Sequence, residues 1–216
     1  MFALFLEFLL HLDVHLDLII QHYGALTYAI LFLVILCETG LVVTPFLPGD
    51  SLLFAAGAFA ARGSLDPLIL FTLLSAAAVI GDTLNYAIGH FLGPRVFRMK
   101  IPFLNHEHLM RTEEFYERHG GKTIVLARFI PIIRTLAPFV AGVGSMKYGR
   151  FIGYNVIGGI VWVALFVFGG YFFGNIPWVK ENFTLVILAI IVLSLVPGAY
   201  HYAMHRWKKY CALKVP

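Results

Sequence analysis

Two arginines, Arg128 and Arg134, lie within an otherwise apolar stretch, TIVLARFIPIIRTLAPFVAGVGSM, at residues 123–146. Arginine keeps its charge in proteins. At a bilayer centre that charge costs roughly 2.5–3.5 kcal/mol on insertion scales, so an intramembrane arginine indicates a functional site. The planar fork of N–H donors fits phosphate oxygens two at a time. We therefore predict that the two arginines bind an anion or an acidic partner, with phosphate as a well-suited anion.

Three of the twelve acidic residues lie inside apolar segments: Glu38, Asp50 and Asp82. A carboxylate buried near the membrane midplane either pairs with a cation or binds a proton. A carboxylate that alternates between these states couples proton movement to another process. We assign this role to Glu38 and Asp50. The alternative is that they pair permanently with the two arginines and only lock the fold.

Polar residues next to Asp82 extend the candidate site. Asn85 and Tyr86 follow it by one helical turn and share its helix face. They either support the charged residues or form a polar cluster that packs helices together.

The composition is that of a polytopic membrane protein, because 60% of the residues are hydrophobic and only 13% are charged. Four apolar runs are long enough to span a bilayer: 25–42, 68–92, 151–173 and 183–203. The net charge of +4 is modest and gives no indication of nucleic-acid binding. We predict one all-α membrane domain over residues 1–216.

The first 24 residues are predicted to form an amphipathic helix at the membrane interface. Leucine, phenylalanine and isoleucine recur there near helical spacing. The segment contains no lysine or arginine, so it lacks the basic region of a signal peptide.

Two further apolar stretches, 43–61 and 123–146, either cross the membrane once or enter and return on the same side. If both cross, the lysines and arginines divide equally between the two faces. If both are re-entrant hairpins, one face holds twelve: six in 93–122, two in 147–150 and four in the tail. The positive-inside rule favours the hairpins and places both termini in the cytoplasm.

The two hairpins would enter from opposite faces, which is typical of inverted-repeat transporters. We predict a first half (25–92), a cytoplasmic amphipathic loop (93–122), a second half (123–205) and a basic tail (206–216). About four spanning helices and the two hairpins make up this architecture.

Motifs of other chemistries are absent from the sequence. There is no phosphate-binding Walker loop, no HExxH motif and no Ser/His/Asp arrangement at a familiar spacing. We therefore expect no metal, no cofactor and no enzymatic activity.

The sequence resembles the DedA family, the bacterial branch of the SNARE-associated or VTT-domain membrane proteins. The resemblance covers roughly residues 25–205, and five motifs occur in the same order. They are Glu38; Pro45 to Asp50 (PFLPGD); Gly81-Asp82 with Tyr86 and Gly89; Arg128 to Arg134 (RFIPIIR) leading to Ala141-Gly142 and Met146; and Phe151, Asn155, Gly158 and Trp162.

This resemblance implies two oppositely entering hairpins, Glu38 and Asp50 as the functional acidic pair, and Arg128 and Arg134 as the arginine pair. It also implies transport of undecaprenyl phosphate or a related phosphate-headed lipid across the bacterial inner membrane, dependent on the proton-motive force. Asn155 is a supporting residue on this basis. A proton-coupled ion antiporter and a membrane lipid phosphatase are the alternatives, and a homo-oligomer is left open.

Overall fold

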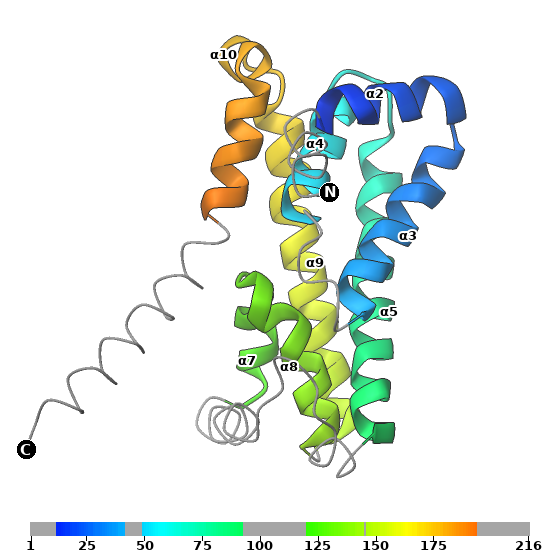
Figure 1. The fold of residues 1–216 in the computed structure, drawn as a ribbon, viewed down its shortest axis with the longest axis vertical. Coiled ribbons are helices and arrows are strands. Elements are labelled where there is room, and N and C mark those ends of the chain that lie inside the picture. Colours follow the sequence, from blue (N-terminus) through cyan, green and yellow to red (C-terminus); the bar gives the residue numbers. More distant parts are fainter. Residues whose placement is uncertain (1–11, 42–48, 93–119, 145, 194–216) are drawn as a thin grey trace, which may run out of the picture.

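The computed structural model describes residues 12–41, 49–92, 120–144 and 146–193, which form helices joined by turns (Figure 1). The longest are α5 (Pro67–Leu92) and α9 (Tyr148–Phe173), of 26 residues each. At 1.5 Å per residue each is about 39 Å long, which exceeds the hydrocarbon thickness of a bilayer. They are the two helices in the described ranges that are long and apolar enough to cross a membrane. They correspond to the predicted spans 68–92 and 151–173.

The other described helices are shorter: α2 (Leu12–Tyr23), α3 (Leu26–Gly40), α4 (Gly49–Ala61), α7 (Lys122–Ala127), α8 (Pro131–Val143), α10 (Pro177–Glu181) and a last helix over Phe183–Leu193. Predictions for residues 1–11, 42–48 and 93–119, and for the last span and tail beyond residue 193, lie outside the described residues.

Helices α3 and α4 run antiparallel and form hairpin one. At the open end, the backbone N–H of Asp66, just before α5, donates to the hydroxyl of Tyr28 in the first turn of α3 at 2.6 Å. At the tip, the N–H of Gly49 donates to Glu38 Oε1 at 3.1 Å. Gly40 lies against Gly81, midway along α5. Hairpin one therefore covers only the first half of α5 and returns to the end where it began.

This arrangement corrects the predicted path of the first half. We predicted that 25–42 crosses alone and that 43–61 forms a separate hairpin at the far side. Instead α3 is the first arm of the hairpin, and α4 is the second. Helix α2 consequently lies at the end of the body where α5 begins (Figure 1). Its Leu16 is buried in the main apolar core, while Val14 and Leu18 are exposed.

Helices α7 and α8 form hairpin two, which approaches from the opposite end. Gly121, just before α7, contacts Tyr154 near the start of α9. At the far end of α8, Gly142 packs against the backbone of Tyr86 and His90 near the end of α5. The turn between the arms is extended at Ile130, as expected for a residue before proline. The tips of both hairpins thus lie beside the middle of α5.

Each hairpin packs through glycine against a long helix of the other half. In α5, Gly89 meets the backbone of Phe139 in α8, and in α9, Gly170 meets the backbone of Phe54 in α4. Both glycines occur at the same position of their helices, 67 to 89 and 148 to 170. This reciprocal packing is the structural feature that corresponds to the predicted repeat.

Two adjacent glycines of α9 test this packing. A Cβ at Gly170 would meet the carbonyl oxygen of Phe54, whereas one at Gly169 would meet nothing within 4 Å. We expect Gly170→Ala to destabilise the fold by about 1–3 kcal/mol through overpacking. Gly169→Ala is the control and should stabilise the helix by up to about 1 kcal/mol. The measurement is the apparent Tm of each purified variant in detergent; equal shifts would contradict the close contact.

Candidate functional site

The tips of the two hairpins meet at a buried ion-pair cluster. From α8, Arg134 donates through Nη2 to Glu38 of α3 at 2.5 Å and through Nη1 to Asp50 of α4 at 2.8 Å. All three side chains are buried. One cation of hairpin two is therefore held by two carboxylates of hairpin one.

Local sequence explains why these groups point at one another. Glu38 lies in the last turn of α3, and Asp50 in the first turn of α4, so the masked connection brings both to one tip. Pro138 follows Arg134 by four residues and lacks the N–H that would bond the Arg134 carbonyl. The polar backbone of α8 is thus least satisfied in the turn that carries the charge.

Trp162 of α9 joins the cluster. Its indole Nε1–H donates to Asp50 Oδ1 at 2.8 Å. The guanidinium carbons of Arg134 and Arg128 lie 4.9 and 6.0 Å from its ring centroid. A buried cation near an aromatic face is stabilised electrostatically. Trp162 therefore contacts one carboxylate and lies near both arginines.

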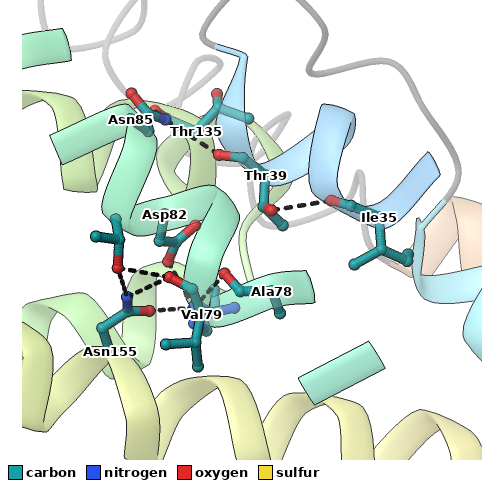
Figure 2. A network of polar contacts seen from close by, with 10 residues as sticks. Ile35, Thr39, Ala78, Val79, Asp82, Asn85, Thr135 and Asn155 are labelled. Carbon is teal, nitrogen blue, oxygen red and sulfur yellow. Dashed lines mark hydrogen bonds and ion pairs between the residues drawn. The ribbon is translucent and has the colours of Figure 1, made fainter. Parts of the chain in front are cut away.

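A second ion pair lies beside the first. Arg128, in the turn after α7, donates through Nη2 to Asp82 of α5 at 2.6 Å and to Asn155 of α9 at 2.5 Å. The amide nitrogen of Asn155 in turn donates to Val79 O at 3.0 Å and Thr83 Oγ1 at 3.3 Å. Figure 2 shows Asn155 reaching across to α5 beside Asp82 and Val79.

Asn85 and Tyr86 tie the two hairpins to α5 instead of touching the charges directly. The amide of Asn85 donates to the carbonyls of Thr39, at 3.2 Å, and Thr135, at 2.8 Å, and so links the two tips (Figure 2). The hydroxyl of Tyr86 donates to the carbonyl of Met146, beyond the open end of hairpin two. Both residues fit the helix-packing alternative.

The charges in this cluster do not balance. Three buried carboxylates, Glu38, Asp50 and Asp82, face two guanidinium groups. Among the described residues, several buried polar atoms of the cluster also lack a hydrogen-bond partner: Glu38 Oε2, Asp82 Oδ1, Arg134 Nε, and Arg128 Nε and Nη1. The cluster can therefore gain a proton at a carboxylate or accept an oxygen ligand at a guanidinium. No metal-binding group of histidine, cysteine and acidic residues occurs in the described ranges.

The structure brings together six of the eight residues that the sequence singled out, in a different pairing from the one expected. Glu38 and Asp50 share Arg134, while Arg128 pairs with Asp82 and Asn155. The sequence analysis included Trp162 only in the family match and gave it no role. A signal was present, because Trp162 follows Asn155 by seven residues and so lies on the same helix face.

Two long apolar helices with exposed aliphatic side chains, around a buried group of charges, define a multi-pass membrane protein. Residues 47–172 match the family model of the VTT domain. The chain is 52% identical over 204 residues to "Protein DedA" of Escherichia coli (strain K12), with 93% of each chain covered. The chain therefore belongs to the DedA family of VTT-domain proteins.

Other relatives share less. The chain is 39% identical over 179 residues to an "Uncharacterized membrane protein" of Mycobacterium tuberculosis (strain ATCC 25618 / H37Rv), covering 82% of this chain and 78% of the relative. It is 33% identical over 175 residues to "Inner membrane protein YghB" of E. coli (strain K12), covering 81% and 80%. No solved structure matches. These names support a bacterial inner-membrane location.

Proposed function

We propose that this protein translocates a lipid with a phosphate head group across the inner membrane, coupled to protons. The predicted substrate is undecaprenyl phosphate or a related lipid. Arg128 and Arg134 bind the phosphate, and Glu38 and Asp50 carry the coupling protons. Rocking of the two halves alternates access to the site. The protein is a transporter and performs no covalent chemistry.

The observation that carries this proposal is the sharing of Arg134 by two carboxylates. Burying a second carboxylate against one guanidinium leaves one negative charge without a partner, and this favours uptake of a proton. An incoming phosphate adds further negative charge to a buried site, which is unfavourable unless carboxylates become neutral. Phosphate binding and proton binding would thus assist each other.

The proposal places both hairpins inside the membrane as re-entrant elements. Non-helical backbone at that depth is tolerated only when protein surrounds it, and the tip residues Glu38, Arg128 and Arg134 are buried. Twelve of the sixteen lysines and arginines belong to 93–122, 147–150 and the tail. The positive-inside rule therefore puts the open end of hairpin two in the cytoplasm and α2 on the periplasmic side.

Translocation in reconstituted liposomes tests the function. A fluorescent short-chain polyprenyl phosphate is placed in one leaflet, and its transfer is followed with and without a pH gradient. The matching polyprenol, which lacks phosphate, is the control lipid. We expect transfer of the phosphate lipid only, accelerated by the gradient.

Two outcomes would overturn this function. Release of inorganic phosphate by the purified protein would indicate a lipid phosphatase. Proton flux driven by a metal cation, in liposomes without the polyprenyl lipid and without its transfer when present, would indicate an ion antiporter.

A further inference from the structure

The two buried arginines differ in how many of their N–H groups are already taken. Arg134 uses both terminal nitrogens, one on Glu38 and one on Asp50. Arg128 makes all its described hydrogen bonds through Nη2, to Asp82, Asn155 and, at 3.4 Å, the carbonyl of Ala78. Its Nε and Nη1 have no partner among the described residues, although the side chain is 1% exposed.

Buried N–H groups without an acceptor are costly, and native proteins retain them chiefly at functional sites. In Arg128 the acceptors converge on one nitrogen and leave two others available. The same arrangement fixes the plane of the guanidinium, because Asp82 and Asn155 approach from two different helices. Arg128 is thus oriented by the protein while part of its donor fork is kept for something else.

The packing around Arg128 favours a fixed position. A Cβ at Gly158 would lie 3.2 Å from Arg128 Cδ, and one at Gly159 would lie 3.5 Å from Nη2. The two glycines of α9 therefore leave a slot for the arginine stem. Both α5 and α9, which supply Asp82 and Asn155, are the long helices of the body and belong to neither hairpin.

We infer that Asp82 and Asn155 are positioning residues that hold Arg128 by Nη2 so that Nη1 and Nε are presented to a phosphate oxygen. Arg128 is then the preformed phosphate contact. Arg134 becomes available only after the carboxylates of hairpin one release it. This inference rests on the proposed function and divides its two arginines into a fixed contact and a gated one.

Binding is measured apart from translocation, through the emission of Trp162. In a Trp178→Phe/Trp207→Phe background, Trp162 is the remaining tryptophan, and it lies near both guanidinium groups. A short-chain polyprenyl phosphate is titrated into the protein in detergent, and the Kd is taken from the change in emission. KM and kcat come from the liposome assay.

We expect Asn155→Ala to raise Kd and KM about tenfold or more, because Arg128 loses one of the partners that orient it. Asn85→Ala is the matched control. It removes a buried amide of α5 that bonds backbone carbonyls and does not touch Arg128, so it should lower Tm and leave Kd unchanged. If Asn155→Ala binds with wild-type affinity, or if both variants weaken binding equally, the positioning role is wrong.

Replacements of Asp82 keep the inference testable if Asn155→Ala fails to fold. Asp82→Asn retains an oxygen acceptor for Nη2, whereas Asp82→Ala does not. We expect Asp82→Asn to bind the phosphate lipid as well as wild type, and Asp82→Ala to bind it about tenfold more weakly. Equal loss in both would mean that charge, and not orientation, is what Asp82 supplies.

The failures can be told apart. Wild-type protein that binds the phosphate lipid without translocating it would contradict the proposed function and leave the positioning role standing. Translocation by wild type, with unchanged affinity in Asn155→Ala, would contradict the positioning role alone.

Discussion

Replacing Arg134 with alanine is expected to abolish lipid translocation, by about 100-fold or more, while the protein stays in the membrane. The substitution removes the cation that two carboxylates of hairpin one share, at 2.5 Å from Glu38 and 2.8 Å from Asp50. It also removes the donor fork that would hold phosphate. The long helices α5 and α9 make membrane insertion independent of this side chain. The measurement is the initial rate of transfer in liposomes that contain equal amounts of inserted protein.

Two matched variants make the Arg134 result interpretable. Arg134→Lys keeps the charge and loses the planar fork, so it should retain the fold and transport at an intermediate rate. Arg62→Ala removes an exposed arginine that lies over the rings of Phe59 and Phe183, and it should transport normally. Normal transport by Arg134→Ala would show that the buried charges only lock the fold.

The long helices were predictable because their signal is local. A run of apolar residues fixes where a helix can lie in a membrane, whatever its neighbours do. The predicted spans 68–92 and 151–173 became α5 and α9, which begin one and three residues earlier. Hairpin two was also placed correctly at its charged turn, since Pro131 and Pro138 prevent one continuous helix through Arg128 and Arg134.

Hairpin one was misplaced because the rule used to orient it had nothing to count. The first 24 residues contain no lysine or arginine, so the charge balance is the same whether α3 crosses the membrane or turns back. The apolar length of 25–42 then favoured a crossing. What decides the matter is tertiary contact, above all the hydrogen bond from Asp66 to Tyr28, between residues 38 positions apart.

The members of the site were easier to predict than their pairing. A charge within an apolar segment is visible in sequence, and this identified Glu38, Asp50 and the two arginines. Which carboxylate meets which arginine depends on how α5 and α9 pack, and Asp82 reaches Arg128 across 46 residues. Trp162 carries no charge, so its contact with Asp50 was recognisable only from the structure.

Glu38→Gln is expected to remove the effect of a pH gradient on translocation while leaving the protein folded. Glu38 Oε1 accepts hydrogen bonds from Arg134 Nη2 and from the N–H of Gly49. A glutamine oxygen can accept both. The substitution leaves Arg134 with one carboxylate, Asp50, so the local charge becomes balanced and one proton-binding group is lost. Initial transfer rates with and without an imposed gradient should then be equal.

Glu181→Gln is the control for this substitution, because Glu181 is exposed in α10 and remote from the hairpin tips in sequence. It should keep the full response to the gradient. If Glu38→Gln also keeps that response, the proton must be carried by another carboxylate of the cluster, and Asp50 and Asp82 are the two that the geometry leaves. If Glu38→Gln instead unfolds, the negative charge of Glu38 serves the fold, because the hydrogen-bonding atoms are preserved and only the ion pair with Arg134 has been lost.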